Sequence, residues 1–261
     1  MMIFDFSGKI CAVTGAGAGM GQAISLMLAE NGAEAVVMVD LGESFMAETI
    51  GKMEAIGGNY RCVYGDLSHV DFAKHFVEYT IEEFGRIDVL VNVAGIVQVN
   101  SLDTITEADF DKTMAINVKA PMFATQVAAR QMIAQGHGSI VVIASTAGIM
   151  GVGNRMAYST SKGALVIMCK SIAAELAGTN VRINCVCPGT VDTPSMEKRF
   201  QAMPDPVAGK KAFMAKELNG RLGTSEELAK TVLFAASEDV DYLNGSTIIV
   251  DGGMTCCTGK N

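Results

Sequence analysis

A tyrosine and a lysine stand four residues apart, at Tyr158 and Lys162, in the helix-patterned stretch AYSTSKGALVIMCKSIAAEL. Side chains at this spacing lie on one face of a helix. A tyrosine hydroxyl has a pKa of about 10 and transfers protons poorly at neutral pH, but a neighbouring ammonium favours the phenolate. Ser145 lies upstream at the end of a predicted strand, where its hydroxyl can hydrogen-bond a carbonyl or an alcohol. Together the three residues indicate proton transfer at the oxygen of an alcohol or ketone.

A second group of residues indicates nucleotide binding. The run TGAGAGMG, from Thr14 to Gly21, follows a strand-like segment and opens a helix-patterned one. Glycines here permit a tight turn and close approach of backbone N–H groups to a pyrophosphate, and the helix N-terminus adds favourable partial charge. The next predicted strand ends in Asp40, whose carboxylate can accept hydrogen bonds from both adenosine ribose hydroxyls and would repel a 2'-phosphate. Because no Lys or Arg occurs between Lys9 and Lys52, the sequence predicts NAD as the cofactor.

The elements that must position these groups alternate between two patterns. Apolar, β-branched runs predict seven strands with helical segments between them, at 9–15, 33–40, 60–66, 87–95, 138–145, 181–189 and 246–253. Near-continuous apolar strands are typical of a parallel sheet covered on both faces. Two helix starts resemble capping boxes, at Thr106 with Asp109 and at Thr224 with Glu227. The sequence therefore predicts an α/β fold, a single-domain, doubly wound, Rossmann-like, seven-stranded parallel sheet with helices on both faces, over residues 1–261.

Composition and charge exclude several classes of protein. The chain of 261 residues has 20 Lys+Arg against 28 Asp+Glu, a net charge of -8, and no Trp. This balance, with no basic run longer than two residues, argues against nucleic acid as a partner. The stretch between Arg130 and Arg155 has no formal charge but carries Gln, His, Ser and Thr, so it does not fit a membrane span. The N-terminus lacks the pattern of a signal peptide, and we expect a cytoplasmic protein.

The cysteines indicate neither a disulfide framework nor a metal site. Seven of them lie at positions 11, 62, 169, 185, 187, 256 and 257, with no CxxC pair and no zinc-like spacing to histidine. We therefore expect reduced thiols and no metal. Cys185 and Cys187 alternate in a strand-like run, a pattern typical of small buried hydrophobes. The sequence assigns no role to the adjacent Cys256 and Cys257.

The motifs occur in an order that resembles the short-chain dehydrogenase/reductase superfamily. They are TGAGAGMG, Asp66-Leu67, NVAG at 92–95, Asn117, Ser145, YSTSK at 158–162, PGTVDT at 188–193 and VDGG at 250–253. The resemblance covers essentially the whole chain, and NVAG in place of the NNAG of many members is a small departure. It implies that Tyr158 is the general acid/base and that Lys162 binds the nicotinamide ribose and lowers the tyrosine pKa. It also implies that Ser145 orients the substrate and that Asn117 holds a water in a proton relay behind the lysine.

The same resemblance implies which residues bind NAD. Asp66 would meet the adenine amino group, Asn92 would support the cofactor cleft, and the turn 188–193 would cover the nicotinamide. The predicted cofactor-binding residues are Thr14, Gly15, Gly19, Met20, Gly21, Asp40, Asp66, Leu67, Asn92, Ala94, Gly95, Tyr158, Lys162, Pro188, Gly189, Val191 and Thr193.

A proline-rich segment from about 190 to 221 interrupts the regular alternation, and long irregular connections of this kind are often lids over active sites. Here the sequence resembles the branch with cytosolic type 2 3-hydroxybutyrate dehydrogenase, 4-oxoproline reductase and 2-keto-3-deoxy-sugar-acid dehydrogenases. In that branch cations at three places receive a substrate carboxylate, which implies Arg155, Arg199 and Lys216 as substrate-binding residues beside Ser145 and Tyr158. Lys216 departs from the usual arginine and lacks its bidentate fork. Residues 193–221 carry six Lys or Arg and three Asp or Glu, a local charge of +3.

Two other functions remain open on the sequence. Apolar residues of the lid, among them Met196, Phe200 and Phe213, would suit a dehydrogenase of a steroid or another bulky neutral alcohol. A non-catalytic NAD-binding regulator would need the glycine loop but not the proton relay. The main hypothesis is an NAD-dependent dehydrogenase that interconverts a secondary alcohol and a ketone on a small hydroxy acid. The resemblance further implies a homotetramer that assembles through the segments 106–135, 156–177 and 246–253.

Overall fold

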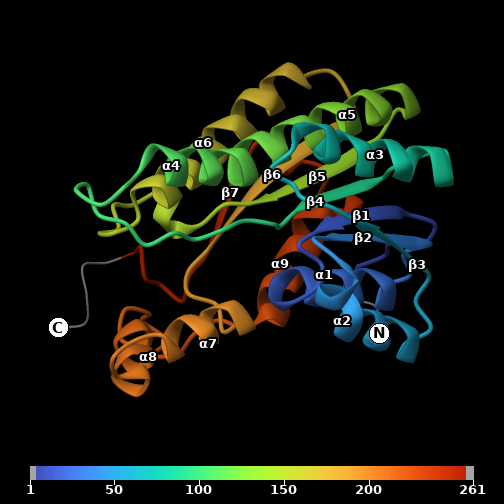
Figure 1. Cartoon of the computed structure of the whole chain (residues 1–261). Coiled ribbons are helices and arrows are strands. Elements are labelled where there is room, and N and C mark those ends of the chain that lie inside the picture. Colours follow the sequence, from blue (N-terminus) through green and yellow to red (C-terminus); the bar gives the residue numbers. More distant parts are fainter. Residues whose placement is uncertain (1–3, 257–261) are drawn as a thin grey trace.

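The seven predicted strands form one parallel sheet in the order β3-β2-β1-β4-β5-β6-β7 in the computed structural model, which describes residues 4–256 (Figure 1). The strands are β1 Ile10–Thr14, β2 Ala35–Asp40, β3 Tyr60–Tyr64, β4 Val89–Asn92, β5 Gly138–Ile143, β6 Val181–Pro188 and β7 Thr247–Val250. The predicted fold class is confirmed. The strand order reverses between β1 and β4, and ligands of such sheets bind outside the carboxyl ends of the strands at this point.

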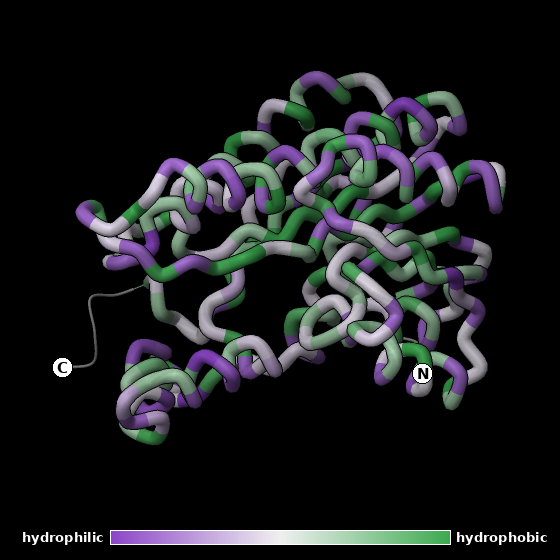
Figure 2. Tube along the Cα trace, in the orientation of Figure 1, coloured by the Kyte–Doolittle hydropathy of each residue, from purple (hydrophilic) through white to green (hydrophobic). Residues whose placement is uncertain are grey.

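Helices cover both faces of the sheet (Figure 1). One face carries α1 Gly19–Glu30, α2 Glu43–Ala55 and α9 Ser225–Ala236. The other carries α3 Val70–Phe84, α4 Glu107–Met114, α5 Ala120–Gln135 and α6 Met156–Glu175, with a π-helical turn at Ala115–Lys119 between α4 and α5. In the central strands, alternate residues pack into the two cores: Ile140 and Val142 of β5 face one cluster, and Val141 and Ile143 face the other. Figure 2 shows the resulting hydrophobic centre of the molecule.

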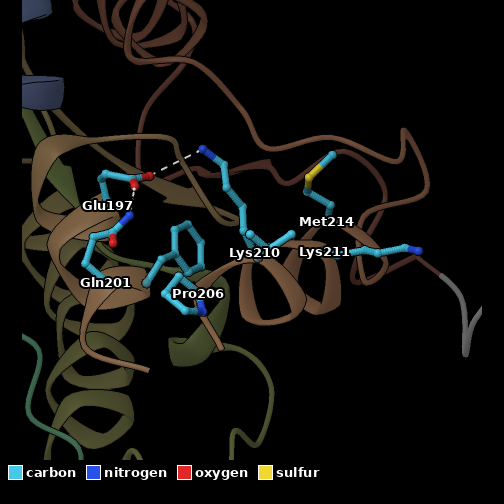
Figure 3. Close-up of a pocket in the computed structure, with 8 residues that line it drawn as sticks. Glu197, Gln201, Pro206, Lys210, Lys211 and Met214 are labelled. Atoms are coloured by element: carbon cyan, nitrogen blue, oxygen red, sulfur yellow. Dashed lines mark hydrogen bonds and ion pairs between the residues drawn. The ribbon is translucent and has the colours of Figure 1, made fainter. Parts of the chain in front are cut away.

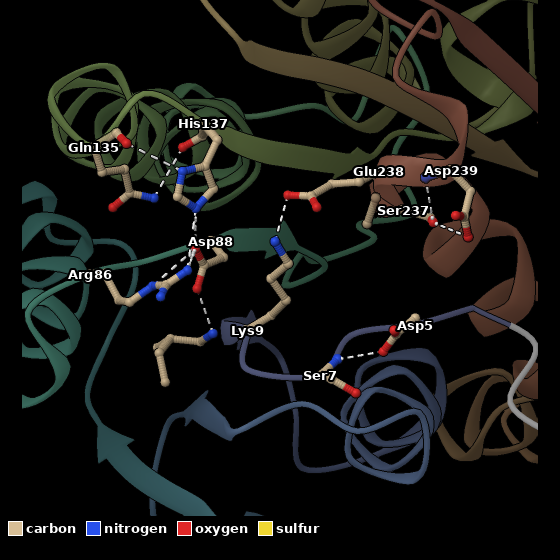
Figure 4. A network of polar contacts seen from close by, with 12 residues as sticks. Asp5, Ser7, Lys9, Arg86, Asp88, Gln135, His137, Ser237, Glu238 and Asp239 are labelled. Atoms are coloured by element: carbon tan, nitrogen blue, oxygen red, sulfur yellow. Dashed lines mark hydrogen bonds and ion pairs between the residues drawn. The ribbon is translucent and has the colours of Figure 1, made fainter.

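A polar network ties together the amino ends of three strands, on the edge of the sheet opposite the predicted site (Figure 4). The carboxylate of Asp88, buried beside β4, accepts a hydrogen bond of 2.7 Å from the Ile10 N–H of β1. It also accepts from the Arg86 guanidinium at 2.6 Å, and His137 Nε2, just before β5, lies 2.7 Å away. Because a buried carboxylate is costly unless it is hydrogen-bonded and paired, this network fixes the strands to one another.

The predicted helix caps are present. Thr224 and Glu227 form the full reciprocal box at the start of α9. At α4, Thr106 accepts from the Asp109 N–H, but its hydroxyl, and not its backbone N–H, bonds the Asp109 carboxylate. Both helix starts are therefore set by local side-chain hydrogen bonds.

The segment 190–221 is more regular than the sequence predicts, because it contains two short helices, α7 Pro194–Gln201 and α8 Pro206–Met214. Each begins with a proline, and proline favours the first turn of a helix, where its missing N–H has no intrahelical partner to lose. Thr193 and Asp205 cap them by accepting from the N–H groups of Met196 and Ala208. Figure 1 shows the pair standing away from the layers of the sheet. We call residues 190–221 the lid.

None of the helices within residues 4–256 is long and apolar enough to span a bilayer.

Candidate active site

Helix α6 carries Tyr158 and Lys162 toward the carboxyl end of β5. Only 4% of Lys162 is exposed, and its Nζ donates a hydrogen bond of 2.7 Å to the Ile143 carbonyl at the end of that strand. The same Nζ lies 5.8 Å from the centroid of the Tyr158 ring. Burial lowers the pKa of Lys162 to about 8, because a desolvated ammonium is disfavoured. The lysine therefore sits fixed beneath the tyrosine, as the four-residue spacing predicts.

Opposing effects act on the pKa of the Tyr158 hydroxyl. Burial raises its pKa, whereas a hydrogen bond from Ser145 and the positive charge of Arg155 both lower it. Ser145 follows β5, and its Oγ accepts from the Ala147 N–H at 3.1 Å, which caps the short turn Thr146–Gly148. The structure thus brings together the hydroxyl, the serine and a cation, and that cation is the arginine at the start of α6.

Asn117 lies in the π-helical turn and is fully buried. Its Oδ1 accepts from the Ile96 N–H at 2.8 Å, and its Nδ2 donates to the Ile96 carbonyl and to Ser161 Oγ, both at 3.0 Å. A Cβ added to Gly95 would lie 3.2 Å from Asn117 Oδ1 and 3.5 Å from Lys162 Nζ. The asparagine therefore joins the loop after β4 to helix α6. The sequence did not single out Ser161, although it lies inside the YSTSK motif.

The glycine loop leaves the start of α1 open to an anion. Its N-cap residue, Ala18, gives no side-chain hydrogen bond, and the first turn has no acidic residue. Gly15 and Gly19 have φ of +67° and +55°, a conformation that favours glycine. A side chain on Gly21 would overlap the Gly15 carbonyl. These uncapped N–H groups on a tightly folded loop, with Met20 in the first turn, fit the pyrophosphate of a dinucleotide.

Asp40 is held by the backbone of that loop. Its Oδ2 accepts from the Gly17 N–H at 2.9 Å and its Oδ1 from the Leu41 N–H at 2.8 Å. A Cβ on Gly17 would overlap the Phe45 carbonyl and lie 2.9 Å from Asp40 Oδ2. Gly17 was not among the predicted cofactor-binding residues, although it is the second glycine of the run. Because the loop has no room for a side chain there, it cannot present a basic residue to a 2'-phosphate from that position.

The other predicted cofactor residues gather at the ends of β1 and β4. Thr14, Leu67, Asn92 and Ala94 line one small cavity. The Thr14 hydroxyl accepts from the N–H groups of Val93 and Ala94, and so fixes the loop after β4. Asp66 accepts from the Ser68 N–H at 2.8 Å, and this hydrogen bond lowers its pKa. The strand ends thus supply a shaped crevice next to the glycine loop.

The turn after β6 connects this crevice to the lid. Pro188 ends the strand, and a Cβ on Gly189 would lie 2.8 Å from the Asp251 Cα. Val191 pairs with Gly223 at the other end of the lid. The Thr193 side chain, which caps α7, lies 3.2 Å from where a Cβ on Gly19 would stand. The turn therefore spans the distance from the sheet to the glycine loop.

The three predicted substrate cations lie in two places. Arg155 is buried at the start of α6. In the lid, the Arg199 guanidinium carbon lies 5.0 Å and Lys216 Nζ 4.5 Å from the centroid of the Phe213 ring. The structure brings the two lid cations together around one ring, and no hydrogen bond among residues 4–256 joins them to Arg155.

Both predicted strand cysteines, Cys185 and Cys187, are fully buried. Cys256 is exposed, and its Sγ lies 3.1 Å from the Gly253 carbonyl. Cys257 lies outside the described residues.

Comparison with known proteins agrees with this geometry. A family model described as enoyl-(acyl carrier protein) reductase matches residues 15–255. An uncharacterised oxidoreductase from Thermotoga maritima is 40% identical over 251 residues, which cover 96% of this chain and 99% of that one. Dehydrogenase/reductase SDR family member 6 from Xenopus laevis is 39% identical over 249 residues, 95% of this chain and 98% of that one.

Solved structures show the same architecture. The crystal structure of a 3-oxoacyl (acyl-carrier-protein) reductase from Agrobacterium tumefaciens C58, with NADP bound, superposes with a TM-score of 0.88 at 30% identity. The match covers 96% of this chain and 95% of that one. This chain therefore belongs to the short-chain dehydrogenase/reductase family, whose members are oxidoreductases that bind a nicotinamide cofactor.

Proposed function

We propose that this protein is an NAD-dependent dehydrogenase that interconverts a secondary alcohol and a ketone on a small hydroxy acid. When bound, the cofactor supplies the hydride acceptor or donor. Tyr158 Oη holds the proton that leaves or joins the alcohol oxygen, and Ser145 orients that oxygen by hydrogen bonding. Lys162, anchored on the Ile143 carbonyl, holds the tyrosine side of the site in place. Asn117 keeps the loop after β4 against α6.

The observation that carries the hydroxy-acid proposal is the state of Arg155. Arg155 and Arg182 are equally buried, each 8% exposed. Arg182 donates to five backbone carbonyls at the end of α9 and beyond it. Arg155 donates only to the Asn154 carbonyl, at 2.6 Å, and forms no ion pair within residues 4–256. Since a guanidinium has five N–H donors and a buried charge needs partners, Arg155 is prepared to bind an anion beside Tyr158.

The lid supports the same assignment. Lys210 is paired with Asp192 and Glu197, at 3.1 and 3.4 Å, whereas Arg199 and Lys216 contact the Phe213 ring and have no carboxylate partner in the described chain. A cation over an aromatic face is held in position but keeps its donors available. A substrate carboxylate that reaches both the lid and Arg155 would draw the lid toward the catalytic helix.

The choice of NAD over NADP rests on Asp40. The related Agrobacterium reductase was crystallised with NADP, so family membership alone leaves both cofactors open. In this chain a carboxylate stands at the end of β2, hydrogen-bonded to the Gly17 and Leu41 N–H groups. A 2'-phosphate placed there would meet a fixed negative charge, and the loop has no room for a compensating side chain on Gly17. We therefore propose NAD.

One observation favours a second candidate, a dehydrogenase of a bulky neutral alcohol. A cavity of about 300 Å³ lies between α7 and α8 and is lined in part by Phe200, Pro206, Val207 and Met214 (Figure 3). Its volume is at the lower end of the range for pockets that hold drug-sized ligands, and these apolar side chains would suit a bulky apolar alcohol. The third candidate is a non-catalytic NAD-binding regulator. Such a protein would not need Ser145, Tyr158 and Lys162 to lie together, so their arrangement argues against it.

A screen of NAD reduction over hydroxy acids, their amides and matching neutral alcohols tests these alternatives. We expect turnover of one or more hydroxy acids, with kcat/KM at least about 100-fold above that of the amide, the size of one lost bidentate ion pair. Equal rates for acid and amide would contradict the carboxylate proposal, and preference for steroid alcohols would favour the second candidate. Absence of turnover with every alcohol, together with tight NAD binding, would favour the regulator.

We further propose a cytoplasmic homotetramer. Large apolar side chains are exposed on the segments that the family resemblance assigns to assembly: Phe110, Met122, Ile133, Met156, Ile167 and Ile249. Burying such side chains between copies is favourable. Sedimentation equilibrium is expected to give four times the chain mass of 27.4 kDa, and a monomer at micromolar concentration would contradict the proposal.

A further inference from the structure

Glu217, which follows α8 at the base of the lid, is a buried carboxylate without a cationic hydrogen-bond partner. Only 2% of the residue is exposed. Its Oε1 accepts a hydrogen bond of 3.1 Å from the Thr190 N–H, and its Oε2 is buried and accepts no hydrogen bond from the described residues. A carboxyl group in such a place is costly, so its presence points to a role beyond packing.

Three segments meet at this carboxyl. The first is the end of the lid after α8, which carries Glu217 itself, and the second is the turn 188–193 where the lid begins, through Thr190. The third is the turn after β7: a Cβ on Gly252 would lie 3.4 Å from Glu217 Oε2, and the Asn219 N–H donates to the Gly252 carbonyl at 3.2 Å. Glu217 therefore stands where the end of the lid, the turn after β6 and the turn after β7 come together.

The electrostatic setting agrees with an anchoring role. Burial raises the pKa of Glu217, the hydrogen bonds from Thr190 lower it, the nearby Asp251 raises it, and Lys216 lowers it. Asp251 is satisfied by its own turn, because it accepts from the N–H groups of Gly253 and Thr255. Among the described residues, the Thr190 N–H is therefore the hydrogen-bond donor that the Glu217 carboxyl holds in place.

We propose that Glu217 is a positioning residue for the nicotinamide end of the cofactor. Its carboxyl accepts a hydrogen bond from the Thr190 N–H. This contact fixes the position of the turn 188–193 over the crevice and joins the turn to the end of the lid after α8. This inference rests on the proposed placement of the nicotinamide beneath that turn, and it does not depend on which alcohol is oxidised. Lid and turn would then respond together when the cofactor binds.

The test compares binding of NADH with binding of ADP-ribose, which lacks the nicotinamide, by calorimetric titration. Glu217→Met removes the acceptor and fills the space with an uncharged side chain of similar size, so that no cavity is created. We expect it to weaken NADH binding about tenfold, the effect of losing one hydrogen bond to a charged group, and to leave ADP-ribose binding unchanged. Glu217→Gln keeps a carbonyl acceptor for Thr190, and we expect it to bind NADH within about twofold of the unchanged protein.

A matched control separates positioning from general destabilisation. Asp88→Asn weakens the polar network at the amino ends of β1, β4 and β5, on the edge of the sheet opposite the turn 188–193, and is expected to lower Tm with both affinities unchanged. The proposal is overturned if Glu217→Met binds NADH normally, or if it weakens NADH and ADP-ribose equally. Failure of both Glu217 variants to fold would make the residue purely structural and would overturn it as well. A wrong hydroxy-acid assignment would leave these binding results unaffected.

Discussion

The proposed catalytic cluster on α6 and the cationic part of the lid differ in how far their polar groups have partners within the protein. Around Tyr158 the polar groups other than Arg155 have partners inside the protein: Lys162 donates to Ile143, and Asn117 to Ile96 and Ser161. In the lid, Arg199 and Lys216 lie over the Phe213 ring without a carboxylate partner among residues 4–256. Apart from Arg155, the first arrangement is satisfied within the protein, whereas the two lid cations are not paired with a carboxylate in the described chain.

This difference separates the chemistry from the selection of substrate. A catalytic group works best when its neighbours need not reorganise during the reaction, which a satisfied network provides. A recognition group must keep donors available for the ligand, and binding then closes the segment that carries it. We expect changes in the cluster to affect every substrate, and changes in the lid to affect only substrates that carry the matching charge.

The largest effect is expected for Tyr158→Phe, which removes the hydroxyl that we propose transfers the proton and keeps the ring near Lys162. We expect kcat to fall about 1000-fold for acids and neutral alcohols alike, because general acid/base catalysis is lost. NADH affinity should stay within about twofold, since the binding loop is untouched. Steady-state kinetics and NADH titration measure both quantities. Loss confined to acids would show that Tyr158 belongs to recognition.

The burial of Lys162 can be tested through the pH dependence of the free energy of unfolding. Its pKa is lowered by burial to about 8, from the ordinary value of 10.5 that applies in the unfolded chain. Between these values the folded chain binds fewer protons than the unfolded chain, so stability rises with pH across this window. Relative to Lys162→Met, the apo protein should gain on the order of 3 kcal/mol from pH 8 to pH 10.5 in urea unfolding. If the free energies of unfolding of the two proteins changed equally with pH, the pKa of Lys162 would not be lowered in the folded state.

Arg199→Met tests the lid directly. We expect kcat/KM for hydroxy acids to fall about 10- to 100-fold, the value of a charged hydrogen bond, while neutral alcohols and NADH are unaffected. Lys198→Met, one residue earlier on the same helix and exposed, is the matched control and should change neither. An equal loss on neutral alcohols would place Arg199 in lid packing through Phe213. Weaker NADH binding would instead place it at the cofactor.

The sequence predicts the cluster better than the lid for physical reasons. Strands and catalytic residues follow from local patterns, such as the apolar runs, the glycine loop and the spacing of Tyr158 and Lys162. The predicted strand 246–253 is longer than β7 Thr247–Val250, because the glycines after Val250 form a turn. In the lid, the prolines suggested irregular chain, yet Pro194 and Pro206 start helices.

Long-range contacts could not be read from local patterns. The meeting of Arg199 and Lys216 at Phe213 depends on how α7 and α8 pack. The hydrogen bond from Thr190 to Glu217 joins residues on either side of both helices. Arg155 likewise lies against the loop after β4, where its backbone forms an isolated parallel bridge with Asn100. Each of these features depends on tertiary packing, which has no periodic signature in the sequence.

The smallest effect is expected for Lys216→Arg. A lysine offers a point charge, whereas arginine offers a planar fork that can bind a carboxylate through two parallel hydrogen bonds. If Lys216 contacts the substrate carboxylate, the change should raise kcat/KM for hydroxy acids about threefold and leave neutral alcohols unchanged. Lys211→Arg, at an exposed cation of α8 that lines the cavity between α7 and α8, is the control. Because Phe213 holds Lys216 beside Arg199, unchanged kinetics for both Lys216→Arg and Lys216→Met would show that Arg199 alone provides the lid's charge for the substrate.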